Sequence, residues 1–224
     1  MHDLEKFEPA NIKAFLQQTL RHKNTLIASE FGKVVADATR FVQAVIRDGF
    51  DIALADLTTN VQVQPDRPFI EVAEALVDHH IRFAKRADQE LARKSLLEAY
   101  TYIAGPRHLF EPTKKTRFVQ SLRRSDLKKF AGMLISLHLY NVIRVQIEDE
   151  LRKNLSDVKT LELYLLSVEA LCRDLILDSI KIQPGELDER WVMAVIRSVE
   201  RQLIDSSSSS AESLHIPVQT RFRK

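Results

Sequence analysis

The sequence has few of the residues that several protein classes require. Its 224 residues include one cysteine and five glycines. A single cysteine cannot form a disulfide framework inside the chain, and it cannot complete a cysteine-rich zinc site. Five glycines leave little for turn-rich β architecture or for a phosphate-binding loop, because both need residues with positive φ. We therefore expect none of these classes.

The sequence also lacks the segments that direct secretion or membrane insertion. Its first eight residues, MHDLEKFE, mix both charge signs and have no apolar core, unlike a signal peptide. No uncharged apolar run reaches the ~18 residues of a membrane span. The nearest, residues 130–143, contains Ser136, His138 and Asn141. We expect a cytoplasmic protein with no membrane span, and the low cysteine content fits that compartment.

Helical periodicity is present along most of the chain. The clearest example is the segment 25–49, where apolar residues recur every three or four positions, with Asn24 or Thr25 as the expected cap and Gly49 as the expected stop. Similar patterns predict helices over residues 9–22, 68–104, 115–122, 156–182 and 186–205, and a further long helix that begins at residue 125 and includes residues 130–147. The segment 68–104 is either one long helix or two helices that meet near Ala87. Ser125 is the expected N-cap of the next long helix, with Asp126 beside it.

These patterns predict an all-α protein. We expect one domain of six or seven helices over residues 1–205, with two long central helices and a subdomain boundary left open near residues 105–115. Residues 130–147 are apolar around most of the helix circumference, which is typical of a surrounded central element. Residues 206–224 begin with five serines and end with a basic sequence, and we expect a flexible tail there.

Charge is unevenly distributed along the chain. Its formal net charge is only +2, yet the segment 107–129 has a net charge of +6 between flanking segments of −2 and −4. Eight basic residues produce this excess: Arg107, Lys114, Lys115, Arg117, Arg123, Arg124, Lys128 and Lys129.

Such a segment could neutralise the phosphates of a nucleic acid, with Phe110, Phe118 and His108 available for base stacking. No recognised nucleic-acid-binding motif accompanies it. The alternative is a solvated surface segment that pairs with acidic faces of its own fold or of an acidic partner, and this alternative is favoured because charge by itself defines no site.

A second group of candidate residues lies on the two long helices. His138 and Asn141 on the first helix, with Glu169, Cys172 and Arg173 on the second, could line a pocket, with His138 as a general base or Cys172 as a nucleophile. The favoured alternative is a hydrogen-bonded core histidine and an inert buried thiol, because an unpaired polar group inside a protein costs about 1–3 kcal/mol.

We expect no metal and no cofactor. The adjacent residues His79 and His80 would project about 100° apart from a helix, which suits a single metal ion poorly. Glu71, Glu74 and Asp78 share one helix face, but Arg82 four residues beyond Asp78 favours a surface ion-pair ladder over a cation site.

The carboxyl-terminal tail contains the last candidate feature. Leu214, Ile216, Val218 and Phe222 lie at even-numbered spacings beyond the serine run, a pattern that could add as a strand to a partner's sheet or lie in a groove. A disordered terminus is the alternative.

Taken together, these features favour a non-catalytic helical interaction protein that acts as a subunit or regulator of a larger assembly, with a protein partner or a second copy of the chain. A nucleic-acid-binding helical domain that uses residues 107–129 is the first alternative. The second is a small-molecule-binding or enzymatic domain with a pocket near His138. No catalytic motif is present, which favours a protein that is not an enzyme.

Overall fold

The computed structural model describes residues 8–57, 69–84, 88–104, 113–124, 126–155 and 157–204, and these fold into nine α-helices with no strand among them. The helices are α1 (Pro9–Leu20), α2 (Ser29–Asp48), α3 (Phe50–Leu57), α4 (Phe69–Ile81), α5 (Gln89–Ala104), α6 (Thr113–Arg123), α7 (Leu127–Asn154), α8 (Val158–Ile182) and α9 (Glu189–Ile204). The all-α prediction is confirmed. The tail 206–224 and most of the boundary region 105–115 lie outside the described residues.

The prediction of six or seven helices was too low, and the main reason lies between residues 81 and 89. The segment predicted over residues 68–104 is divided into α4, which ends at Ile81, and α5, which begins at Gln89. The two helices pack against each other. A single helix of this length would extend about 55 Å. Reversal of the chain lets both halves bury their apolar faces in one core, which a straight helix could not do.

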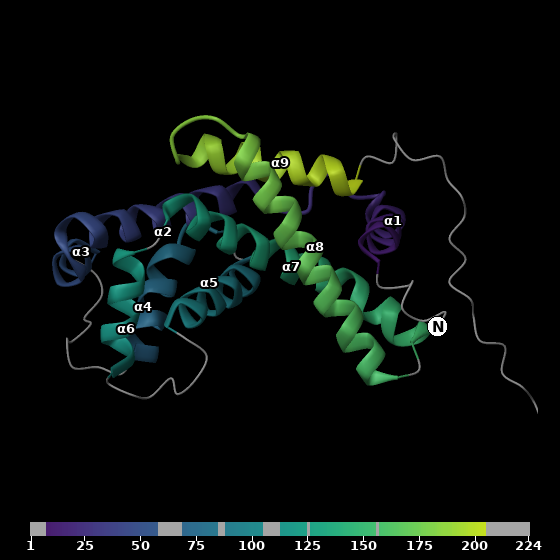
Figure 1. The fold of residues 1–224 in the computed structure, drawn as a ribbon, viewed down its shortest axis with the longest axis horizontal. Helices are drawn as coiled ribbons and strands as arrows, with labels where there is room; N and C mark the ends of the chain where they lie inside the picture. Colours follow the sequence, from purple (N-terminus) through teal and green to yellow (C-terminus); the bar gives the residue numbers. More distant parts are fainter. Residues whose placement is uncertain are drawn as a thin grey trace, which may run out of the picture.

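Helix α7 occupies the centre of the fold. It packs against α2, α5 and α8, and most of its residues between 130 and 147 are buried, as predicted for a surrounded helix. Figure 1 shows α2 to α6 gathered on one side of the molecule, with α9 across the top. The α7–α8 hairpin extends away from α3 to α6 as an arm, and α1 lies beside this arm.

The buried apolar residues form one continuous cluster with members in each described helix. On the side of α3 to α6, the cluster contains a group of aromatic rings. The ring of Phe118 in α6 lies 6.1 Å from Phe50 of α3, 4.7 Å from Phe69 of α4 and 5.7 Å from Tyr100 of α5, measured between centroids. One side chain of α6 therefore connects three other helices.

One helix is long and apolar enough to cross a membrane by length and composition, namely Leu127–Lys153 of α7. Two thirds of its most apolar stretch is buried inside the protein, as in the core helix of a soluble domain. This helix therefore does not test the expectation that the chain lacks a membrane span.

Several helix ends follow the sequence signals. Gly49 ends α2 with a φ of 94°, a conformation that side-chain-bearing residues rarely adopt, and its N–H donates to Val45. Asp157 caps α8 by accepting hydrogen bonds from the N–H groups of Lys159 and Thr160. The N-cap of α7 is Asp126, which accepts from Lys129, rather than the predicted Ser125. An aspartate also interacts favourably with the helix dipole, which explains the preference.

The start of α2 differs from the prediction. Helix α2 begins at Ser29, and neither Asn24 nor Thr25 caps it. Instead, Glu200 of α9 reaches the preceding turn, where its Oε1 accepts the N–H groups of Leu26 at 2.7 Å and Ile27 at 2.9 Å. Glu200 is buried. A carboxylate from a distant helix therefore satisfies backbone donors that a local polar residue was expected to serve.

We expect Glu200→Ala to lower the free energy of unfolding by about 2–4 kcal/mol, because it leaves two buried backbone donors without an acceptor. Glu200→Gln is the matched control, since its amide oxygen can still accept from both N–H groups, and it should cost less than half as much. Urea denaturation of the two variants measures the difference. Equal losses would contradict the role of the Oε1 acceptor.

Candidate functional site

The predicted pocket residue His138 lies in the core, where only 2% of its surface is exposed. Its imidazole stacks on the ring of Phe31, with centroids 3.6 Å apart and planes 14° apart. Its Nδ1 lies 3.2 Å from Oγ of Ser95, and that oxygen also accepts a hydrogen bond from Nδ2 of Asn141 at 3.1 Å. The structure therefore brings His138 and Asn141 together through a serine of α5 that the sequence had not indicated.

The hydrogen bonds fix the tautomer of His138. The hydroxyl of Ser95 donates its single proton to the carbonyl oxygen of Leu91 at 2.7 Å. Nδ1 of His138 must then donate to Ser95, because a hydroxyl has only one proton to give. Burial lowers the pKa of His138 to about 4, although an interaction with the carbonyl of Leu91 opposes this shift. A neutral, stacked and enclosed imidazole is suited to a structural role.

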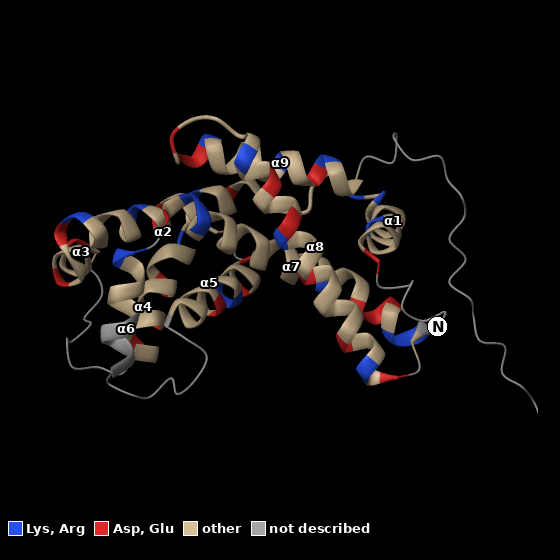
Figure 2. Cartoon of the chain, viewed as in Figure 1, with Lys and Arg blue, Asp and Glu red and all other residues tan. Residues whose placement is uncertain are grey.

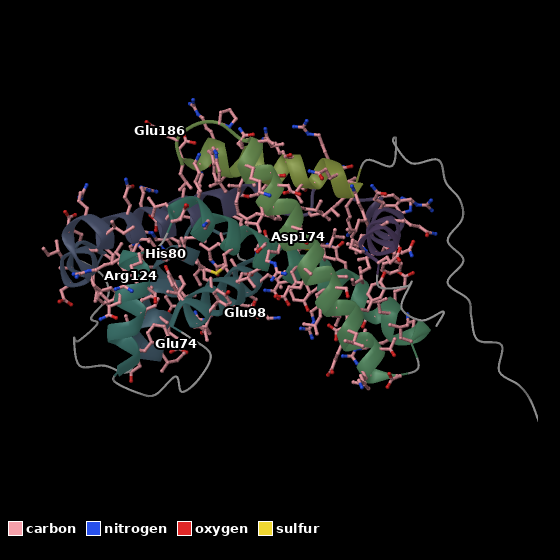
Figure 3. All side chains as sticks on the ribbon, in the orientation of Figure 1. Glu74, His80, Glu98, Arg124, Asp174 and Glu186 are labelled. Carbon is pink, nitrogen blue, oxygen red and sulfur yellow. The ribbon has the colours of Figure 1, made fainter. Side chains whose placement is uncertain are left out.

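The other predicted pocket residues lie on α8, and the hydrogen bonds that connect His138 to Ser95 and Asn141 do not involve them. Cys172 is fully buried, and burial raises the pKa of its thiol to about 12, opposite to the direction that activates a nucleophile. Glu169 is half-buried. The guanidinium of Arg173 is exposed and lies 3.9 Å from the carboxylate of Asp174, a residue that Figure 3 labels on α8.

Only part of the basic segment 107–129 can be placed. Arg107 lies outside the described residues, and Lys114, Lys115 and Arg117 belong to the first turns of α6, where the backbone alone is described. Arg123, Arg124 and Lys129 are exposed.

Two of the placed basic residues lie next to different elements. The ammonium of Lys128 lies 5.4 Å above the ring of Trp191 in α9, whereas a guanidinium nitrogen of Arg123 lies next to Gly49 at the end of α2. Nucleic-acid binding by this segment stays a prediction. Phe118, expected to be available for base stacking, has no exposed surface, so that expectation was wrong.

A buried cluster of polar residues joins α2 to α4. Oδ2 of Asp37 lies 2.8 Å from Nδ1 of His80 and 3.6 Å from Nε2 of His79. All three residues are buried, and His80 has no exposed surface. The Nε2 atoms of both histidines are buried without a hydrogen-bond partner. Figure 3 places His80 in the interior, on the side of the molecule formed by α2 to α6.

The ionisation of this cluster follows from its surroundings. Burial lowers the pKa of both histidines, so their rings are neutral at pH 7. Burial would raise the pKa of Asp37, but the hydrogen bond with His80 and the nearby positive charges outweigh burial and lower the pKa. Arg40 follows Asp37 by three residues on α2, and its guanidinium lies 3.4 Å from Oδ1 of Asp37. An ionised carboxylate therefore lies between two neutral imidazoles.

No pattern in the sequence predicts that Asp37 lies beside the two histidines. Asp37 lies more than 40 positions before them, and no spacing rule connects a residue of one helix to a pair on another. The two histidine rings are nearly perpendicular, with an interplanar angle of 87°, in keeping with the divergence expected on a helix. Both can nevertheless approach one carboxylate, because Asp37 lies on a neighbouring helix rather than on their own.

The outward face of α8 is unusually apolar. Leu163 is 46% exposed, Leu166 is 59% exposed and Leu177 is 37% exposed. Val145 of α7, on the same hairpin, is 64% exposed. The buried residues of α8, such as Leu161, lie on the opposite side of the helix. Scattered exposed apolar residues are normal, whereas leucines that recur along one helix face, here interrupted by Arg173, indicate an interaction surface.

No protein-family model, curated protein or solved structure matches the chain. The class that the fold defines is therefore an all-α protein, and its function has to be argued from its own residues.

Proposed function

We propose that this protein is a helical interaction protein that acts as a subunit of a larger assembly and pairs with a second copy of itself through the outward face of α8. The line of exposed leucines on that face is the observation that carries the proposal. Leu163, Leu166, Ala170 and Leu177 follow one another at spacings of three, four and seven residues. This is the a/d spacing of a coiled-coil seam.

The length of α8 suits such a seam. Its 25 residues correspond to about 37 Å of helix, or more than three heptads. Burial of a fully exposed leucine contributes about 1.5–3 kcal/mol, and the three leucines of this face, which are about half exposed in the monomer, have about half of that still to gain. After the entropy cost of association, this corresponds to a weak dimer with a dissociation constant in the micromolar range or above.

The charges of the hairpin favour a second copy over a strongly charged partner. Residues 127–182 contain eight basic and eight acidic residues, so their net charge is zero. Figure 2 shows both signs interspersed along α7 and α8. Two copies of a neutral, mixed surface do not repel each other, and Arg173, which occupies the seam position between Ala170 and Leu177, can find an acidic residue across the interface.

Sedimentation velocity over a concentration series tests this proposal. We expect the wild-type protein to change from monomer to dimer at micromolar concentrations. Leu163→Lys combined with Leu166→Lys should raise the dimer dissociation constant at least about 100-fold, because it replaces two leucines that the dimer would bury with charges that repel across the seam.

The matched control is Glu90→Lys, which makes the same change of two charges at an exposed position on α5. It should leave the dissociation constant within about threefold of wild type. A wild-type protein that stays monomeric at about 100 µM, or a dimer that both variants weaken equally, contradicts pairing through α8.

A further inference from the structure

We propose that Asp37, His79 and His80 form a binding site for one divalent transition-metal ion of the zinc type, which would join α2 to α4. Two imidazole nitrogens and one carboxylate oxygen are a ligand set that zinc and related ions take up. The cluster lies far from the outward face of α8 in the chain, and the proposal does not depend on the dimer.

Nδ1 of His80 forms a hydrogen bond of 2.8 Å with Oδ2 of Asp37, which a bound ion would replace, whereas the His79 distance fits a shared cation better than a hydrogen bond. Nε2 of His79 lies 3.6 Å from Oδ2 of Asp37, which is too long for a hydrogen bond. Two ligand atoms that each lie about 2.1 Å from one tetrahedral zinc ion are separated by about 3.4 Å. The three ligand atoms lie within 4.8 Å of one another, so side-chain rotations that move these atoms by about one ångström would bring them to a common ion.

The unpartnered nitrogen of His79 is the second observation. His79 is more than nine-tenths buried, and its Nε2 has no hydrogen-bond partner although it points toward Asp37. Buried polar atoms are rarely left without a partner, because the cost is about 1–3 kcal/mol. A cation bound between Nε2 of His79 and the carboxylate would remove this cost.

The surroundings enclose the cluster, and one exposed side chain lies between its carboxylate and a surface groove. The rings of Phe41 and Tyr100 lie 6.1 Å and 6.2 Å from that of His80. Beside α2, a surface groove is lined by Ala36, Arg40 and Phe83 among others. Arg40 is largely exposed and contacts the other carboxylate oxygen, Oδ1. Movement of this one side chain toward solvent would open the carboxylate to an incoming ion.

Calorimetric titration of the full-length, chelator-treated protein with zinc chloride tests the proposal. We expect one zinc ion per chain with a dissociation constant at or below about 1 µM. Saturating zinc should raise the melting temperature by about 5–10 °C, because the ion binds the folded state alone. Cobalt chloride should give visible absorption bands of a low-coordinate nitrogen and oxygen site.

His79→Leu is the decisive variant. It removes a nitrogen that has no partner, so the metal-free melting temperature should stay within a few degrees of wild type, whereas zinc affinity should fall at least about 100-fold. The matched control is His22→Leu, at an exposed histidine that lies outside the cluster, and it should leave zinc binding unchanged.

Asp37→Asn provides a second variant of nearly unchanged shape, and it too should lose at least about 100-fold in affinity. Absence of one-to-one zinc binding in the wild-type protein would overturn the proposal. So would zinc binding that persists in both His79→Leu and Asp37→Asn, because the ion would then lie elsewhere in the chain.

Discussion

Phe118→Ala should lower the free energy of unfolding by about 3–5 kcal/mol, the usual cost of deleting a large aromatic side chain from a packed core. Phe118 has no exposed surface, and its ring contacts Phe50, Phe69 and Tyr100 on three other helices. Removal of the ring leaves a cavity where the three helices meet, and it also removes aromatic contacts of about 0.5–1.5 kcal/mol each. Equilibrium denaturation with urea measures the loss.

The neighbouring residue offers a matched control. Val119 follows Phe118 on α6 and is only partly buried, so Val119→Ala should cost about 1 kcal/mol or less. A loss of similar size in the two variants would mean that the aromatic group does not hold α6 to the core. A Phe118→Ala protein that keeps its stability but loses nucleic-acid binding would instead restore base stacking as the role of this ring.

Acid should destabilise the protein through His138. The pKa of this residue is about 4 in the folded chain, against the ordinary value of 6.5 for histidine. Below pH 6.5 the imidazole therefore binds a proton in the unfolded chain but not in the folded chain. The free energy of unfolding falls as the pH falls. The difference amounts to about 2 kcal/mol at pH 5 and about 3 kcal/mol at pH 4, and it disappears above pH 7.

A comparison of the wild type with a variant that lacks His138 separates the contribution of this residue to the pH dependence of stability from that of the other histidines. His79 and His80 are also buried with lowered pKa values, so the wild-type curve contains several contributions. His138→Leu removes one of them. Urea denaturation at a series of pH values from 4 to 8 should show the wild type losing about 2–3 kcal/mol more than His138→Leu toward pH 4. Parallel curves would show that His138 accepts a proton as readily in the folded state as in the unfolded one.

Local sequence signals predicted much of the fold. The periodicity of residues 25–49, Gly49 at the end of α2 and Asp157 at the start of α8 all depend on neighbours within a few positions, and such signals can be read from one chain. The division between α4 and α5 was predicted only as an alternative. The division depends on whether two helices packed against each other have a lower free energy than one uninterrupted helix. That difference is set by the packing of the whole core.

The candidate sites were less predictable for the same reason. The leucines on more than one face of residues 156–182 were visible in the sequence, but which of them are exposed depends on how α7, α1 and α9 cover α8. The cluster of Asp37 with His79 and His80 has no sequence signal at all. It exists because α2 and α4 cross at these positions. The hydrogen bond from His138 to Ser95 likewise joins residues 43 positions apart.

The carboxylate of Glu200 also has a consequence for the order of events on the ribosome. The N–H groups of Leu26 and Ile27 receive their acceptor from a residue more than 170 positions later. Because synthesis proceeds from the amino terminus, the N–H groups of the turn before α2 cannot reach this acceptor until α9 has left the exit tunnel. We therefore expect this turn to close late in folding, and a chain that stops before residue 200 would lack the acceptor for these two N–H groups.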